Sequence, residues 1–145
     1  MSKISICIPA RYDSSRFPGK PLAEIAGVSM LGRVVALAQS VSEGRKDVEI
    51  FVATDDERIA AHCTELQVEH VMTPKDCHCG SDRALAAIRA REDDGHEVPE
   101  FVINLQGDAP FTPPQVLKAM IEGFEKNPFA EVITPVHRLS WGDLD

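Results

Sequence analysis

The sequence has no long apolar run. Its most apolar stretches, residues 4–10 and 49–53, are far shorter than the roughly 20 residues that a membrane-spanning helix needs. The amino terminus also lacks the separate charged, apolar and cleavage regions of a secretory signal peptide. We therefore expect a cytoplasmic protein with no membrane partner.

Positive charge is scarce as well. Lys and Arg contribute 15 residues against 23 Asp and Glu, which gives a formal net charge of −8. An acidic surface repels phosphates at long range, so we expect no binding to nucleic acid. A small anion can still bind where the few cations gather in one loop.

Cysteine occurs at only four positions, and without a leader sequence we expect reduced thiols. The segment Cys77-His78-Cys79 raises a zinc hypothesis. Structural zinc usually takes four ligands with wider spacing, and no second pair of ligands is evident. Zinc is therefore the weaker interpretation, and a role for Cys77 and Cys79 beyond packing stays open.

Two glycine-rich nucleotide-binding motifs are missing. Gly19-Lys20 is followed by Pro21 and lacks the earlier glycine of a P-loop, and no GxGxxG fingerprint occurs. Both absences disfavour kinase and dehydrogenase functions.

The segments that are present alternate between strand and helix patterns. Short apolar runs predict strands at residues 3–9, 48–53, 68–72, 101–105 and 132–136. Helical spacing predicts helices at 29–42 and at about 82–91. Capping boxes at 54–57 and 112–115 predict the starts of two further helices, the second of which runs to about residue 126. This order predicts an α/β fold, Rossmann-like with three layers, in which a mainly parallel sheet carries helices on both faces. We expect one domain over residues 1–145, truncated at its carboxyl end because no helix follows the last strand.

Four clusters of polar side chains lie beyond the carboxyl ends of the predicted strands, where ligands of such sheets bind. The loop after the first strand contains Arg11, Ser14, Ser15, Arg16, Gly19 and Lys20. Cations, together with a glycine that lets the backbone approach, suit a phosphate group. Prolines at 18 and 21 stiffen this loop, which favours an anion site over a merely solvated one.

The other three clusters are shorter. Asp108, in Gln106-Gly107-Asp108, can hold Mg²⁺ or can simply cap the turn before Pro110, and the residues alone leave both open. In Gly80-Ser81-Asp82-Arg83 we expect Ser81 to cap a helix and Arg83 to point towards the sheet end. Thr54-Asp55-Asp56 is interpreted as helix capping and not as a metal site.

Together these segments resemble the 3-deoxy-manno-octulosonate cytidylyltransferases, also called CMP-Kdo synthetases. The resemblance rests on Ile8–Leu22 (IPARYDSSRFPGKPL), Val52–Ile59 (VATDDERI), Asn104–Asp108 (NLQGD) and, more loosely, Gly80–Arg83 (GSDR). It implies a nucleotidyltransferase fold and the Mg²⁺-dependent reaction of CTP with Kdo to give CMP-Kdo and pyrophosphate for lipopolysaccharide biosynthesis.

The resemblance also implies roles for individual residues. Arg11 and Lys20 would bind the triphosphate and, with Asp108, would be the catalytic residues, while Asp108 would ligate Mg²⁺. The full substrate-binding set that it implies is Pro9, Ala10, Arg11, Ser14, Lys20, Gly80, Arg83 and Gln106.

The chain departs from the family pattern at two places. Gly107-Asp108-Ala109-Pro110 replaces Gly-Asp-Glu-Pro, and Cys77-His78-Cys79-Gly80 replaces His-Gln-Ser-Gly. Family members are also longer, and the remainder carries a second metal-binding aspartate, most of the sugar pocket and the dimer contacts. We therefore expect this chain to be inactive alone and the full-length protein to be a homodimer. Two alternatives stay open: a nucleotidyltransferase for another sugar, and a short non-catalytic nucleotide-binding protein with a closed sheet edge at residues 131–136.

Overall fold

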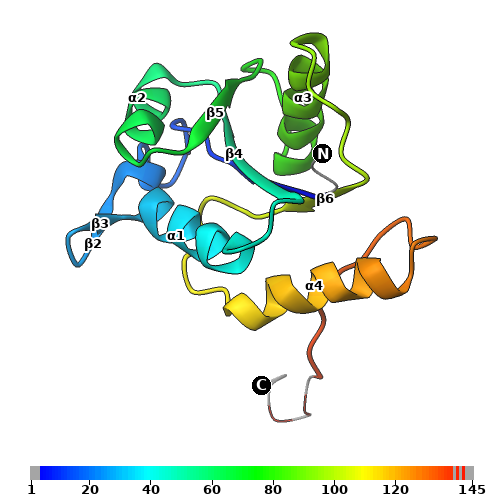
Figure 1. Ribbon diagram of the computed structural model, residues 1–145. Helices are drawn as coiled ribbons and strands as arrows, with labels where there is room; N and C mark the ends of the chain where they lie inside the picture. The colour runs from blue at the N-terminus through cyan, green and yellow to red at the C-terminus, as the bar shows by residue number, and fades with distance from the viewer. Residues whose placement is uncertain (1–3, 139, 141, 143–145) are drawn as a thin grey trace. The chain divides into compact units, whose positions relative to one another are not determined.

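The computed structural model describes residues 4–138, 140 and 142 (Figure 1). These residues form two compact units, which are divided between Thr112 and Pro113. The first unit holds a four-stranded parallel sheet in the order β5-β4-β1-β6. Its strands are β1 (Ile4–Pro9), β4 (Val48–Thr54), β5 (Glu69–Met72) and β6 (Phe101–Asn104). Four of the predicted strands are thus present, and the predicted parallel α/β sheet is confirmed.

Three helices cover this sheet. They are α1 (Met30–Ser42), α2 (Glu57–Glu65) and α3 (Gly80–Asp93), and between β1 and α1 lie a short 3₁₀ helix η1 (Lys20–Leu22) and the hairpin strands β2 (Glu24–Ile25) and β3 (Val28–Ser29). Figure 1 shows α3 across the sheet from α1 and α2, as predicted for helices on both faces. No helix in the described part of the chain is long and apolar enough to cross a membrane.

The α3 face of the sheet is built by alternation along the central strands. Cys7 of β1 and Phe51 and Ala53 of β4 are buried together with Ala84 and Ala87 of α3. Because successive side chains of a strand point to opposite faces, the buried isoleucines of β1 lie on the other face. β1 is buried at every residue since it has a parallel neighbour on each side.

The strand order places a topological switch point beside β1. From β1 the chain steps outward to β4 and β5, and α3 then carries it back to β6 on the other edge of β1. Right-handed crossovers in opposite directions put α3 on the opposite face from α1 and α2. The carboxyl ends of β1 and β6 therefore flank the crevice where ligands of open α/β sheets bind.

Helix capping differs from the prediction at two of these helices. β4 continues to Thr54, and the side chain of Asp56 caps α2 by accepting a hydrogen bond from Arg58 N at 2.9 Å. Of the predicted capping residues only Asp56 caps α2: Asp55 pairs with Arg83 instead, and Thr54 completes the strand. Ser81 is not a cap either, since α3 begins at Gly80 with Cys79 in the capping position.

The second unit contains α4 (Pro114–Lys126), which has a proline in its first turn as predicted. Thr112 does not cap α4; its hydroxyl donates to the carbonyl of Ala109 at 3.1 Å. The predicted strand at 132–136 is wrong, because residues 132–138 have no regular structure and Val132 and Val136 are 82% and 87% exposed. Apolar alternation makes a strand only where a partner pairs its backbone, and Pro135 lacks one donor for such pairing.

Candidate functional site

A cavity of about 350 Å³ opens at the switch point of the sheet. Its wall includes residues that follow β1, β5 and β6. Nine of them are the site residues predicted from the sequence: Pro9, Ala10, Arg11, Ser14, Lys20, Gly80, Arg83, Gln106 and Asp108. The other lining residues are Pro21, Cys77, His78, Cys79 and Gly107. The structure therefore brings the whole predicted set together, while the role of each residue stays a prediction.

The loop from Arg11 to Lys20 is closed by a turn at Gly19. The backbone of Gly19 has φ 73°, a left-handed conformation that glycine adopts without strain, and its N–H donates to the carbonyl of Tyr12 at 2.8 Å. A Cβ at this position would lie 3.0 Å from the Tyr12 ring. The turn leads directly into η1, so that Lys20 reaches the cavity while exposed Arg16 is not part of its lining.

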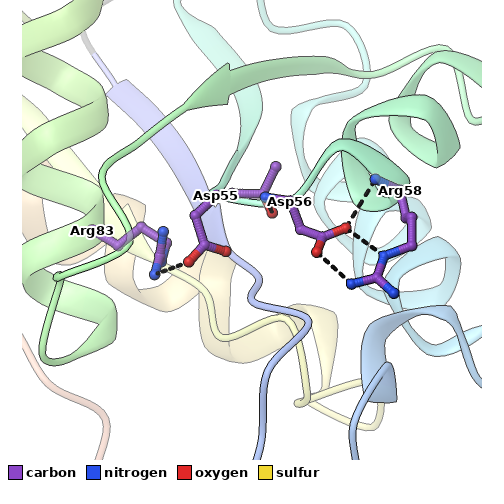
Figure 2. Close-up of polar contacts among 5 residues, drawn as sticks. Asp55, Asp56, Arg58 and Arg83 are labelled. Atoms are coloured by element: carbon purple, nitrogen blue, oxygen red, sulfur yellow. Dashed lines mark hydrogen bonds and ion pairs between the residues drawn. The ribbon is translucent and has the colours of Figure 1, made fainter.

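Tyr12 is itself held by the start of α2, a contact that the sequence analysis missed. The Arg58 guanidinium carbon lies 3.2 Å from the centroid of the Tyr12 ring. Figure 2 shows the same guanidinium bound to Asp56, with Nε–Oδ1 and Nη2–Oδ2 distances of 2.9 and 2.7 Å. These hydrogen bonds from Arg58 hold the pKa of Asp56 below its usual value, and they raise the pKa of Arg58. The cap of α2 therefore also anchors the loop that carries the cations.

Arg83 projects from the first turn of α3 towards the carboxyl end of the sheet, as predicted. It is only 3% exposed. Its Nη1 donates to Thr73 Oγ1 at 2.6 Å. Figure 2 shows its contact with Asp55, in which Nη2 lies 3.3 Å from Oδ2. Buried charges need such partners, so Asp55 and Thr73 fix the guanidinium in the cavity wall.

Two glycines allow the strand ends to approach. Gly107 N donates to Pro9 O at 3.1 Å, and a Cβ at Gly107 would lie only 2.8 Å from that oxygen. At the start of α3, a Cβ on Gly80 would lie 2.7 Å from Gln106 Nε2. The amide of Gln106 is oriented by Asn104, whose Oδ1 accepts from Nε2 at 3.0 Å. Backbone and amide groups are thus packed closely on one side of the cavity.

Lys20 and Asp108 form an ion pair within the lining. Lys20 Nζ lies 2.9 Å from Asp108 Oδ2, and the two side chains are 37% and 54% exposed. The pair joins the loop after β1 to the loop after β6. The accessible carboxylate of Asp108 is the kind of hard oxygen ligand that Mg²⁺ prefers when phosphate and water complete its coordination, and the ion would have to take the place of Lys20 on it.

The zinc hypothesis finds no support in the described residues. Among residues 4–138, 140 and 142, no three His, Cys, Asp or Glu side chains are grouped so that they could hold a metal ion. Cys77, His78 and Cys79 line the cavity but do not make such a group. A single carboxylate such as Asp108 can contribute to a metal site only together with ligands from a bound substrate or water.

Comparisons with known proteins identify the family. The sequence profile of a family described as Cytidylyltransferase matches residues 5–140. The 3-deoxy-manno-octulosonate cytidylyltransferase of Maricaulis maris (strain MCS10) is 43% identical over 135 residues, which cover 93% of this chain and 49% of that protein. The 8-amino-3,8-dideoxy-manno-octulosonate cytidylyltransferase of Shewanella sp. (strain W3-18-1) is also 43% identical, over 125 residues that cover 86% of this chain and 49% of that protein.

A solved structure is similar as well. A CMP:2-keto-3-deoxy-manno-octonic acid synthetase complexed with CTP superposes with a TM-score of 0.73 and 34% sequence identity, covering 88% of this chain and 49% of that chain. The present chain spans about half the length of the curated relatives that it matches.

Proposed function

This chain belongs to the cytidylyltransferase family, and on that premise we propose that its cavity binds CTP and that the whole protein transfers CMP from CTP to 3-deoxy-D-manno-octulosonate (Kdo). The products are CMP-Kdo and pyrophosphate, which places the enzyme in lipopolysaccharide biosynthesis. One observation carries the proposal: all nine predicted residues line a single cavity at the switch point of the sheet. The CTP complex of a related synthetase supports the choice of nucleotide.

The cationic side of the cavity would take the triphosphate. Arg11 offers a fork of donors that matches phosphate oxygens, and Lys20 offers a compact charge. Ser14 adds a hydroxyl from the same loop. Because Gly19 and Tyr12 fix this loop, little entropy remains to be lost when the phosphates bind.

The side formed by Gln106 and α3 would take the cytosine and ribose. Gln106 presents an amide that can both donate and accept hydrogen bonds, as the edge of a pyrimidine requires. Pro9 and Ala10 supply apolar wall beside it, and Gly80 lets the start of α3 pack closely against the Gln106 amide. Arg83 is already bound to Asp55 and Thr73, so it would shape this side and contribute its positive charge.

Asp108 would hold Mg²⁺ through its exposed carboxylate. When bound, the ion supplies neutralisation of phosphate charge. If this assignment is correct, the CTP affinity of the chain should rise when Mg²⁺ is added, and Asp108→Asn should remove that rise. An unchanged Mg²⁺ effect in the variant, measured by calorimetry, would exclude Asp108 as the ligand.

The reaction itself is a displacement at the α-phosphorus. The anomeric hydroxyl of Kdo attacks this atom, forms the new P–O bond and releases its proton to solvent, while the bond to the bridging oxygen breaks and pyrophosphate leaves. Arg11 and Lys20 would hold the triphosphate in line and balance the negative charge on the leaving group. Catalysis would rest on positioning and electrostatics more than on proton transfer.

Two sugars are candidates for the acceptor. The relatives named for the 8-amino sugar match this chain at the same identity as the relative named for Kdo. An 8-amino analogue of Kdo is therefore the second candidate acceptor. We expect the 145-residue chain to bind CTP without turnover, since it spans about half of those relatives. A cytoplasmic location and a homodimeric state of the whole protein remain predictions from the sequence.

The alternative of a short non-catalytic protein loses its structural support. That alternative required a closed sheet edge at residues 131–136, and no strand forms at these described residues.

Calorimetric titration of the chain with CTP, UTP and ATP in the presence of Mg²⁺ tests the nucleotide assignment. We expect CTP to bind more tightly than UTP by at least about tenfold, because the amide of Gln106 must tell the 4-amino group from a carbonyl. Equal affinity for all three nucleotides would mean that the cavity binds the phosphates but does not recognise cytosine. If circular dichroism shows that the chain is folded and the chain still binds no CTP, the proposal for this half of the protein is contradicted.

A further inference from the structure

The four cysteines fall into two pairs with opposite environments. Cys7 and Cys63 are fully buried, and burial raises the pKa of Cys7 to about 12 and that of Cys63 to about 11. Cys77 is half-buried and Cys79 is exposed, and all four are free thiols. Only the thiolate is nucleophilic, and it must also be accessible. Reagents in solution should therefore reach the second pair and not the first while the protein stays folded.

The accessible pair stands in the wall of the candidate nucleotide site. Cys77 and Cys79 both line the 350 Å³ cavity, together with Arg11, Lys20 and Gln106. Cys79 directly precedes Gly80, which packs so closely on Gln106 that an added Cβ would meet its amide at 2.7 Å. A group attached to this segment has little free space on the side of Gln106.

We propose that Cys77 and Cys79 are a thiol-modification site, and that a mixed disulfide with a low-molecular-weight disulfide at this site closes the cavity to CTP. The modification itself is independent of the nucleotide, whereas its effect on CTP rests on the proposed function.

The chemistry is thiol–disulfide exchange. The sulfur of Cys79 or Cys77 attacks one sulfur of the small disulfide, so that a protein–reagent S–S bond forms and the S–S bond of the reagent breaks. One half of the reagent leaves as a thiol and takes the proton from the cysteine. The cysteine is oxidised and the released half is reduced, and a dithiol reductant reverses both changes.

The consequence for binding is steric. With glutathione disulfide, exchange attaches a whole tripeptide to a residue of the cavity wall. A volume of about 350 Å³ cannot hold both this tripeptide and a nucleoside triphosphate. Binding should therefore fall because the space is filled, without unfolding of the sheet beneath.

The test treats the chain and its Cys77→Ser/Cys79→Ser variant with glutathione disulfide under native conditions. Peptide mass mapping locates the mixed disulfides, circular dichroism checks the fold, and calorimetry gives the CTP affinity before and after treatment in each protein. Both proteins retain Cys7 and Cys63, which act as internal controls for the buried thiols. The two single variants show which thiol reacts.

We expect modification at Cys77 or Cys79 only, a CTP affinity at least about tenfold weaker after treatment, and recovery with dithiothreitol. Treatment should not alter the CTP affinity of the double variant. Modification at neither residue, or a modified protein that binds CTP as tightly as before, would overturn the inference. If the untreated chain binds no CTP, the proposed function fails, and the mass map by itself still decides whether these thiols are the modification site.

Discussion

The two ends of the sheet use charged residues in opposite ways, and α3 spans both. At the amino end, Arg91 from the last turn of α3 is buried, with Nη2 at 2.7 Å from Glu49 Oε2 and a further ion pair to Glu69. Its guanidinium also stacks 4.5 Å from the centroid of the Phe51 ring. Every side of this charge is occupied by the protein itself.

The carboxyl end leaves several of its charged side chains exposed. Arg83, near the start of α3, is buried and paired like Arg91, but Lys20 and Asp108 form an exposed pair and Arg11 is exposed at the cavity. Exposed pairs add little stability, whereas a buried pair destabilises the fold strongly when one partner is removed. The difference indicates which charges serve folding and which are free to meet a ligand.

Removal of Arg91 should have the largest effect on stability. Arg91→Ala leaves Glu49 and Glu69 without their partner and should lower the free energy of unfolding by about 3 kcal/mol, the lower end for buried pairs because the Glu69 side chain is 49% exposed. Urea denaturation followed by circular dichroism measures this change.

The matched control for Arg91 lies two residues earlier on the same helix. Arg89 is exposed, so Arg89→Ala should change the unfolding free energy by no more than about 0.5 kcal/mol. Equal effects of both substitutions would mean that the network at the amino end is not a structural charge cluster.

Lys20→Ala should show the opposite behaviour. We expect the affinity for CTP to fall by more than about tenfold, or 1.4 kcal/mol, while the unfolding free energy stays nearly unchanged. Arg16→Ala is the control, because this substitution removes a positive charge from the same loop and Arg16 does not line the cavity. A loss of CTP affinity as large in Arg16→Ala would point to a general effect of charge and not to contact with Lys20.

Most of the first unit follows from local sequence, but the contacts that hold the site do not. The buried runs of β1 and β4 and the spacing of α1 determine their elements, and glycines and prolines mark the loops at the correct end of the sheet. The stacking of Arg58 on Tyr12 joins residues 46 positions apart, and no local pattern reveals it. The same applies to the Lys20–Asp108 pair, which spans 88 positions.

The two kinds of error in the helix and strand predictions have a common cause. Thr54 fits a capping box, yet it is fully buried in β4 because the parallel partner β5 extends the strand through it. Residues 132–136 have strand composition, but no described neighbour pairs with them. In both places tertiary pairing, and not local propensity, determines the outcome.

Asp56 should give a smaller effect that depends on pH. Asp56→Ala removes the cap of α2 and should cost about 1 kcal/mol of unfolding free energy. Asp56→Asn keeps an oxygen for the cap and loses the ion pair with Arg58, so it separates the two contributions. Because the pKa of Asp56 is lowered in the folded state, the ion pair stabilises the fold above the unfolded pKa of about 3.9.

The pH dependence follows with a definite sign. As the pH falls through the lowered pKa, Asp56 becomes protonated and its advantage over Asn is lost, so the stability difference between the native chain and Asp56→Asn should shrink in acid. Urea denaturation at pH 7 and near pH 3 measures this difference. A difference that grows in acid would contradict the assigned direction of the pKa shift.

The coupling between Lys20 and Asp108 should be the smallest effect. A double-mutant cycle with Lys20→Ala and Asp108→Ala should give a coupling in unfolding free energy of about 0.2–1 kcal/mol, reduced further by added salt, because both side chains are exposed. A salt-insensitive coupling above about 2 kcal/mol would place this pair with the buried network of Arg91.

A weak coupling fits the function proposed for this end of the sheet: a triphosphate can draw Lys20 away from Asp108, and Mg²⁺ can take the carboxylate, without a large loss of folding energy. The pair would then keep both charges in position until the ligand replaces each partner with a stronger one.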